Sequence, residues 1–229
     1  MKKFMVLGSN SFSGSHFCKH LIEKGCEVLA TSRSIEPAEA FLPYKWAGSV
    51  SNDFSFVQLD LNKDDDTLSH LLSSFKPEYI VNFAAQSMVA QSWDYPSDWV
   101  DTNVSALTRV IECLKTYHGL EKFVHVTTPE VYGSTSDLIT ENHPFNPSTP
   151  YAVTRAAGDM MLKAFHEKQG LPVIFTRAAN VFGPGQQLYR IIPRVIMACI
   201  TGNRFTLDGG GLSTRSFIHI QDVCNATFE

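Results

Sequence analysis

The start of the chain constrains the fold more than any other segment. A short apolar run, Phe4–Leu7, stops at Gly8, and a polar loop then leads to Gly14. The next residues, His16–Glu23, have helical periodicity, and Gly25 is a suitable helix stop. A buried strand, a glycine-bounded turn and a helix in this order are typical of the first unit of a doubly wound α/β sheet.

Strand and helix patterns alternate over most of the remaining sequence, which favours a mostly parallel sheet covered on both faces. Further strands are expected at Glu27–Ala30, Phe56–Leu59, Tyr79–Phe83, Phe123–Thr127 and Val173–Arg177. Further helices are expected at Asp64–Phe75, Trp99–Lys115 and Ala152–Lys168, and from near Asp222. The connection from Thr31 to Asp53 has no pattern that assigns it.

Composition excludes several classes of protein. Of 229 residues, 44% are hydrophobic, which is enough for one sizeable core. A formal net charge of -4 gives no attraction to nucleic acid or to an anionic membrane surface. No apolar run approaches the ~20 residues that a membrane helix needs. The five cysteines lack paired spacing and the eight histidines lack metal-ligand spacing, so we expect a cytoplasmic protein with reduced thiols and no metal site.

The loop between the first strand and the first helix suits a dinucleotide. Its backbone N–H groups and the N-terminus of the helix can face a pyrophosphate. Gly8 and Gly14 hold the outer positions of a Gly-x-x-Gly-x-x-Gly pattern, whereas the middle position is Ser11. An ordinary tight turn would look similar, but the place of the loop between strand and helix favours the dinucleotide.

The end of the second strand favours NADP over NAD. An acidic residue there would bind the ribose hydroxyls of NAD, but this chain has Thr31-Ser32-Arg33-Ser34. These hydroxyls and the guanidinium could hold a 2′-phosphate, although Arg33 could also be a solvated loop residue. Asp60, at the end of the third strand, is placed to accept a hydrogen bond from the adenine amino group.

Three further segments carry candidate chemistry. Thr127–Gly133 ends one buried strand, Asn82–Ser87 ends another, and Tyr151–Arg155 begins a helix. The spacing of four puts Tyr151 and Arg155 on one helix face, where the guanidinium favours the tyrosinate. Lowering a phenol pKa from ~10 to ~7 requires about 4 kcal/mol.

Taken in order, these segments resemble those of the extended short-chain dehydrogenase/reductases that act as nucleotide-sugar epimerases and dehydratases. The resemblance runs over essentially the whole chain and also includes Asp60-Leu61, Asn103-Val104, Arg177, Asn180–Gly185 and Arg215–Asp222. It implies a Rossmann-like NAD(P)-binding domain over residues 1–180 and the beginning of a smaller, substrate-binding region over residues 181–229. Relatives continue beyond this point, so we expect that region to be truncated.

The resemblance also implies roles for matching residues. Tyr151 would exchange a proton with the hydroxyl on carbon 4 of the sugar, Thr128 would hydrogen-bond the same oxygen, and Arg155 would replace the usual lysine. The expected cofactor contacts are Gly8, Ser11, Phe12, Gly14, Ser32, Arg33, Asp60, Leu61, Ala84, Ala85, Tyr151 and Arg155. The expected substrate contacts are Gln86, Ser87, Asn180 and Arg215, although Arg215 could instead be a surface charge.

Two departures from the family pattern bear on the reaction. Arg155 keeps the charge of the usual lysine, but it is longer and planar and does not deprotonate, so weak activity is an open alternative. Pro129 stands where dTDP-glucose 4,6-dehydratases carry an aspartate, while Glu130 remains. GDP-mannose dehydratases have a similar segment in which the glutamate acts alone.

Glu130 favours 4,6-dehydration, because a 4-epimerase needs no proton abstraction from carbon 5. The expected product is a 4-keto-6-deoxy sugar nucleotide, made by internal hydride transfer with Tyr151 and Glu130 moving the protons. A 4-epimerase or decarboxylase of the same family is the first alternative. A weakly active or inactive module that binds a dinucleotide or a nucleotide-sugar is the alternative from another class.

The helix expected at Trp99–Lys115 has a wide apolar stripe, part of which covers a sheet face. In relatives this helix and the one that carries Tyr151 pair with their copies in a homodimer. The resemblance therefore implies a homodimer that binds a nucleotide-diphosphate sugar, with no nucleic-acid or membrane partner.

Overall fold

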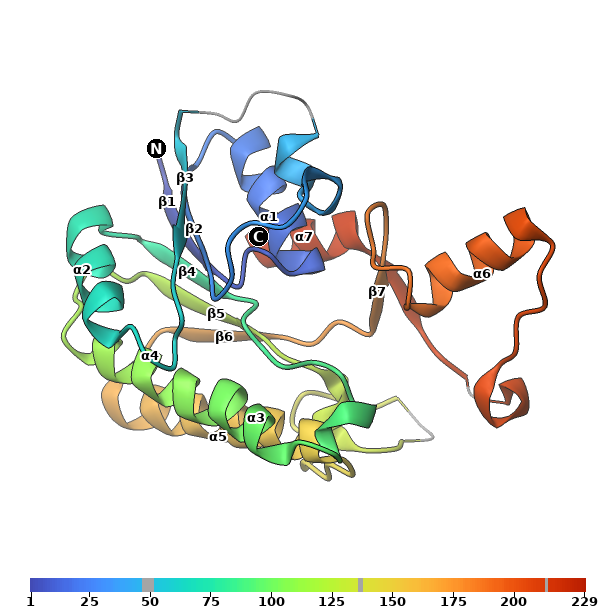
Figure 1. Cartoon of the computed structure of the whole chain (residues 1–229). Coiled ribbons are helices and arrows are strands. Elements are labelled where there is room, and N and C mark those ends of the chain that lie inside the picture. The colour runs from blue at the N-terminus through green and yellow to red at the C-terminus, as the bar shows by residue number, and fades with distance from the viewer. Residues whose placement is uncertain (47–51, 136–137, 213) are drawn as a thin grey trace.

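Six parallel strands form the main sheet of the computed structural model, which describes residues 1–46, 52–135, 138–212 and 214–229 (Figure 1). Their order across the sheet is β3-β2-β1-β4-β5-β6. The strands are β1 (Lys3–Leu7), β2 (Glu27–Ser32), β3 (Phe54–Gln58), β4 (Tyr79–Asn82), β5 (Lys122–Val126) and β6 (Val173–Thr176). The expected doubly wound parallel sheet is confirmed, and its order reverses between β1 and β4, where such sheets bind ligands.

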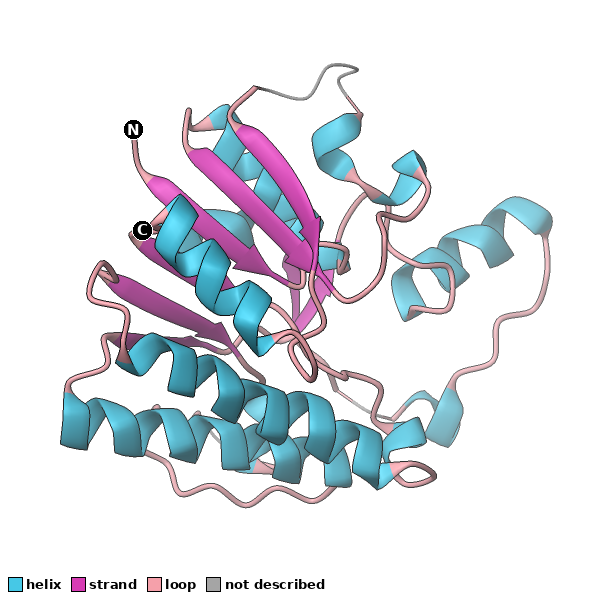
Figure 2. Cartoon of the chain, turned by 60° about the vertical axis from the view of Figure 1, so that its left-hand side comes forward, coloured by secondary structure: helices cyan, strands magenta, loops and turns pink. Residues whose placement is uncertain are grey.

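Helices cover both faces of this sheet (Figure 2). On one face, α1 (Phe12–Glu23) and α7 (Ile220–Phe228) pack over Phe4 and Val6. On the other face, α2 (Asp65–Phe75), α4 (Ala106–Lys115) and α5 (Pro150–Gln169) pack over Met5 and Leu7. Because neighbouring side chains of a strand point to opposite faces, the continuous apolar run of β1 serves both layers.

The helix expected at Trp99–Lys115 consists of three pieces. A short α3 (Pro96–Val100) leads into a π-helical turn (Asp101–Ser105), which continues into α4. Asn103, inside this turn, points away from the helix and bonds the backbone of Gln86. A π turn often marks a functional position, and this one redirects a buried side chain toward the carboxyl end of β4.

The connection after β2 contains two short 3-10 turns, η1 (Glu39–Phe41) and η2 (Pro43–Lys45). Leu42 and Tyr44 are buried in the core cluster that also contains residues of α1. The later part of this connection, at 47–51, lies outside the described residues. This segment, which the sequence pattern left unassigned, therefore covers the outer side of α1.

The end of the chain is more regular than the sequence pattern indicated. β7 (Asn180–Phe182) and β8 (Phe217–His219) form a two-stranded parallel sheet. Between them, α6 (Ile191–Thr201) extends from the main body, and none of its residues is buried (Figure 1). α7 then returns to pack against α1. A separate substrate-binding region from 181 onward remains a prediction. No helix within the described ranges has the length and apolar character to cross a membrane.

Candidate active site

The loop after β1 requires glycine at both of its ends. Gly8 has φ +82°, and a Cβ there would lie 2.6 Å from the backbone N of Ala84. A Cβ on Gly14 would lie 2.4 Å from the carbonyl oxygen of Gly8. Because these glycines have no Cβ, the loop packs closely on the segment after β4, beside the switch point of the sheet. A pyrophosphate site needs glycine in this loop for the same reason.

Ser11 explains why the middle glycine of the pattern is dispensable. Its φ is -71°, which any residue adopts, and its hydroxyl donates to the Gly8 carbonyl oxygen at 2.7 Å. The same hydroxyl accepts from the Gly14 N–H at 3.1 Å and so caps α1. This cap is the reason that α1 begins at Phe12, four residues before the helix that the sequence pattern predicted.

A cavity of about 180 Å³ lies at the switch point, beside this loop. It brings together eight of the expected cofactor contacts, namely Gly8, Ser11, Ser32, Arg33, Asp60, Leu61, Ala84 and Ala85, and also Gln86. Phe12, Gly14, Tyr151 and Arg155 are not among its lining residues. Thr31 and Ser34, whose hydroxyls were expected near a 2′-phosphate, line it as well, and so do Asn62 and Thr102, which the sequence did not indicate. This lining suits the adenosine and pyrophosphate part of a dinucleotide.

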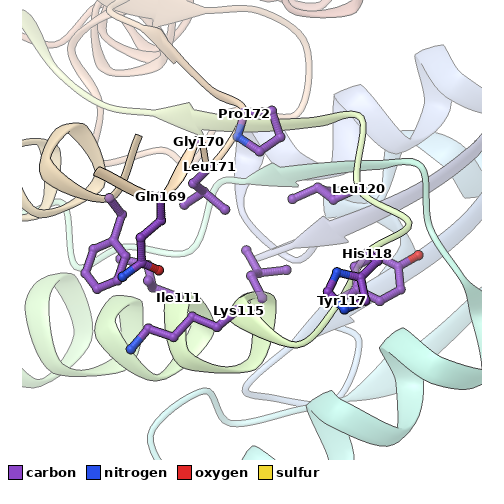
Figure 3. Close-up of a pocket in the computed structure, with 11 residues that line it drawn as sticks. Ile111, Lys115, Tyr117, His118, Leu120, Gln169, Gly170, Leu171 and Pro172 are labelled. Carbon is purple, nitrogen blue, oxygen red and sulfur yellow. The ribbon is translucent and has the colours of Figure 1, made fainter. Parts of the chain in front are cut away.

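A second cavity, of about 270 Å³, lies near the amino ends of β5 and β6, at the opposite ends of the strands (Figure 3). It is lined by residues at the ends of α4 and α5, including Lys115 and Gln169, and by Leu120 and Pro172, just before β5 and β6. Ligands of open α/β sheets bind at the carboxyl ends of the strands. This larger cavity is at the amino ends, far along α5 from Tyr151, and is not the candidate active site.

Tyr151 and Thr128 meet where β5 ends and α5 begins. Both residues are buried, and their side chains are hydrogen-bonded to each other. Burial raises the pKa of the Tyr151 phenol, and the Arg155 guanidinium and the Thr128 hydroxyl oppose this rise. The lowering expected from Arg155 is therefore present, but burial outweighs it. A proton can pass between this phenol and an oxygen held by Thr128.

Glu130 lies next to this pair, in the 3-10 turn η5 (Pro129–Tyr132). Thr128 caps the turn, since its hydroxyl accepts from the Glu130 N–H at 3.2 Å. Although the residue is exposed overall, burial of the carboxyl raises the pKa of Glu130, and Arg215 partly offsets the rise. A raised carboxyl pKa suits a group that must both take and return a proton.

Arg155 is buried, with 3% of its surface exposed. Its guanidinium donates to the carbonyl oxygen of Val126 in β5. One turn further along α5, the Asp159 carboxylate accepts from Arg177 at 2.7 Å. Two guanidiniums thus share one carboxylate, and the excess positive charge is available to stabilise an anion at Tyr151.

His125 stays neutral beside these charges. The Asn82 side-chain oxygen accepts from the Ala84 N–H at 3.0 Å, so its amide NH₂ faces His125 Nδ1 at 3.1 Å. Nε2 of the ring lies 3.3 Å from a guanidinium nitrogen of Arg155 and 3.8 Å from the Asp159 carboxylate. Burial, together with Arg155 and Arg177, holds the pKa of His125 well below its ordinary value.

The remaining predicted residues are distributed around this centre. Gln86 is held by Asn103, whereas Ser87 is exposed. The Asn180 side chain donates to the Ser216 carbonyl oxygen at 2.8 Å and so joins β7 to the segment before β8. Arg215 is close enough to Glu130 to lower its pKa.

Three residues near the centre were missed by the sequence reasoning. Arg190, just before α6, lies close enough to lower the pKa of Tyr151. The Asp159 carboxylate and the neutral His125 ring are buried beside Arg155 and Arg177. Asp159 could have been predicted, because it follows Arg155 by four residues and so lies on the same helix face as Tyr151 and Arg155. No local pattern indicated Arg190 or His125.

The doubly wound sheet, the glycine loop under a cavity at the switch point and the adjacent Tyr151–Thr128 pair define a Rossmann-like nucleotide-cofactor protein. The chain belongs to the NAD dependent epimerase/dehydratase family, whose model matches residues 4–228. This membership confirms the family that the sequence motifs indicated.

Individual relatives are similar over nearly the whole chain. Identity is 29% to the dTDP-glucose 4,6-dehydratase of Xanthomonas campestris pv. campestris (strain B100), over 99% of this chain and 66% of that protein. Identity is 34% to the dTDP-glucose 4,6-dehydratase of Streptomyces antibioticus, over 96% of this chain and 65% of that protein. The chain thus spans about two thirds of the length of the curated relatives it matches.

Solved structures of two activities are similar to this chain. The dTDP-glucose 4,6-dehydratase of Bacillus anthracis str. Ames, in complex with NAD, has a TM-score of 0.86 and 28% identity, over 99% of this chain and 70% of that one. The UDP-glucuronic acid 4-epimerase of Bacillus cereus, in complex with UDP-glucuronic acid and NAD, has a TM-score of 0.88 and 28% identity, over 99% and 72%. The fold alone therefore does not distinguish dehydratase from epimerase.

Proposed function

We propose that this chain carries the cofactor-binding and catalytic part of a nucleotide-sugar 4,6-dehydratase. The observation that supports this most is the carboxyl of Glu130 beside the Tyr151–Thr128 pair, with a pKa raised by burial. The similarity of this chain to the dehydratases of Xanthomonas campestris and Streptomyces antibioticus also supports the proposal.

A bound nicotinamide dinucleotide supplies the acceptor, and later the donor, of the hydride. Tyr151 takes the proton from the hydroxyl on carbon 4, while Thr128 orients that oxygen and Arg155 stabilises the phenolate. The resulting ketone acidifies carbon 5, and Glu130 removes its proton. Glu130 then gives this proton to the hydroxyl that leaves carbon 6 as water. Return of the hydride from the dinucleotide to carbon 6 would require a proton at carbon 5, and this proton is equivalent to the one that Tyr151 took from the hydroxyl on carbon 4. Atoms balance, since one water leaves and no cofactor is consumed.

Replacement of Glu130 by Gln is expected to lower the dehydration rate by roughly 10²–10⁴-fold, because the variant has no base for carbon 5. Oxidation at carbon 4 does not need this group, so cofactor reduction on mixing with substrate is expected to persist. The measurement is loss of water from nucleotide-diphosphate hexoses by mass spectrometry, with dTDP-glucose tested first. Glu112→Gln, on the exposed side of α4, is the control.

Normal turnover by Glu130→Gln would contradict the dehydratase proposal and favour a 4-epimerase. The similarity to the UDP-glucuronic acid 4-epimerase of Bacillus cereus makes that the second candidate. A cofactor-loaded wild type that changes no sugar nucleotide would instead indicate the binding-module alternative, with Arg155 as the suspected cause.

We further propose NADP as the cofactor, although the Bacillus anthracis dehydratase and the Bacillus cereus epimerase were solved with NAD. No acidic side chain ends β2, and Ser32 and Arg33 line the cavity there. The Asn10 amide donates to the carbonyl oxygens of Ser34 and Ile35, both at 2.9 Å, and so holds the loop in place. A fixed loop with hydroxyls and a guanidinium suits a 2′-phosphate.

Arg33→Ala is expected to weaken NADP binding by about 10- to 100-fold, because one charge-assisted contact to phosphate is lost. NAD binding is expected to stay unchanged, because NAD lacks that phosphate. Isothermal titration with both dinucleotides measures the difference, and Lys63→Ala, an exposed cation near Asp60, is the control. Tighter binding of NAD than of NADP by the wild type would refute the preference.

We also propose a homodimer that forms through α5 and through the helical segment Trp99–Lys115, which includes the end of α3 and all of α4. Val153 and Met160, seven residues apart on α5, are 50% and 61% exposed, and Val100 is exposed on α3. Changing both Val153 and Met160 to Asp is expected to give a monomer, since two buried, unpaired charges would face each other across the interface. Light scattering measures the mass. A wild type that is monomeric at all concentrations would refute the proposal. The cytoplasmic location remains a prediction.

A further inference from the structure

Ser92 contacts the peptide group of Tyr151 from a distant part of the chain. It has no exposed surface and ends the 3-10 turn η3 (Ala90–Ser92), which follows β4. Its hydroxyl oxygen accepts from the Tyr151 backbone N–H at 3.1 Å and donates to the Val89 carbonyl oxygen at 2.6 Å. The segment after β4 is thereby bonded directly to the first turn of α5.

The other free amides of that helix turn are satisfied locally. Pro150, the first helical residue, has no N–H. The Ala152 N–H donates to the side chain of Thr149 at 3.1 Å, and the Val153 N–H donates to the Thr149 carbonyl oxygen at 2.9 Å. Of the amides in this turn, that of Tyr151 is the one capped from another segment. Ser92 therefore does more than complete the helix end.

A second connection holds the other side of the Tyr151 peptide. The Thr154 hydroxyl donates to the Tyr151 carbonyl oxygen at 2.9 Å and accepts from the Asn103 amide at 3.0 Å. Asn103 also bonds both backbone groups of Gln86, at 2.9 and 3.0 Å. The segment from Gln86 to Ser92 is thus tied at both ends to the backbone of Tyr151.

We propose that Ser92 is a positioning residue for Tyr151, which fixes the first turn of α5 relative to the segment after β4. With that turn fixed, the phenol keeps its hydrogen bond to Thr128 and faces a sugar bound against Gln86 and Ser87. A misplacement of about 1 Å in such an arrangement can cost about 100-fold in rate. The identity of the sugar rests on the proposed function, but the geometry of Tyr151 does not.

The chain offers a matched pair of variants. Ser92→Ala and Thr149→Ala each remove one hydroxyl that caps one amide of the same helix turn, at the same 3.1 Å. Only Ser92→Ala removes the tie between the segment after β4 and Tyr151. The groups that set the pKa of Tyr151, namely Thr128, Glu130, Arg155 and Arg190, are unchanged in both variants.

The first readout is the absorbance titration of the Tyr151 phenol, with Tyr151→Phe as the blank. Ser92→Ala is expected to shift the titration to higher pH, because a displaced phenol loses the bond to Thr128 that lowers its pKa. The second readout is the pH profile of kcat, where we expect a fall of about 10- to 100-fold with little change in KM. Thr149→Ala is expected to leave both readouts at wild-type values.

Equal effects of the two variants on titration and on kcat would overturn the proposal, because Ser92 would then be an ordinary helix cap. If Ser92→Ala does not fold, Ser92→Cys keeps the volume with a weaker acceptor and is expected to shift the titration in the same direction. An unshifted titration in Ser92→Cys would also overturn the proposal. Because the titration needs no substrate, it tests Ser92 even if no sugar nucleotide is dehydrated.

Discussion

Tyr151→Phe is expected to lower the rate of oxidation at carbon 4 by roughly 10²–10⁴-fold, while the dinucleotide still binds. The phenol hydrogen-bonds Thr128 and lies in the field of Arg155, and phenylalanine leaves the packing of this buried residue in place.

The measurement is cofactor absorbance in a single turnover, after mixing with excess nucleotide-diphosphate hexose. Tyr95→Phe is the control, since Tyr95 is exposed and lies before α3. A rate for Tyr151→Phe within a factor of a few of the control would mean that another group takes the proton. The assignment of the site would then have to be abandoned, although the fold and family would stand.

Asp159→Asn is expected to lower the free energy of unfolding by about 3–5 kcal/mol, because it leaves Arg155 and Arg177 buried without a compensating carboxylate. Asp159 and Arg177 are only 1% and 15% exposed at their side chains, and their atoms are 2.7 Å apart. Removing one partner of a buried pair costs far more than the pair itself contributes, because the remaining charge cannot be solvated.

Urea denaturation measures this loss, and the chain contains a matched control. Asp65 and Arg109 are also 2.7 Å apart, but their side chains are 44% and 45% exposed. Asp65→Asn is therefore expected to change the free energy of unfolding by no more than about 1 kcal/mol. Equal losses of unfolding free energy in the two variants would mean that water solvates the buried cluster. Arg155 would then stabilise an anion at Tyr151 less than we propose.

Helix α6 shows where pattern reasoning fails. Ile191, Ile196 and Ile200 are all exposed, and no face of this helix is buried among the described residues. Most residues of α6 are apolar, yet the helix packs none of them into a core among the described residues. Gly183-Pro184-Gly185, Gly202 and Gly209-Gly210-Gly211 break the alternation of strands and helices and indicated short, loop-rich pieces. The segment was therefore expected to be irregular, and it is a helix.

The π turn at Asp101–Ser105 was not predicted either, but for a different reason. Its residues continue the helical periodicity of α4, so the sequence pattern predicted an uninterrupted helix. The distortion accompanies the contact of Asn103 with Gln86, seventeen residues earlier in the chain. A contact over that separation forms only when α4 and the end of β4 are packed together, and local periodicity contains no information about it.

Local sequence alone determined the six strands of the main sheet and the glycine turn, because short apolar runs must be buried and because Gly8 needs a positive φ. It also placed Tyr151 and Arg155 on one helix face, since helical geometry is local. Only the tertiary structure decided where Arg155 points and which distant side chain holds Tyr151. The Val126 carbonyl and the Ser92 hydroxyl reach α5 through packing between segments. Such contacts depend on the register of strands far apart in the chain, which no local pattern encodes.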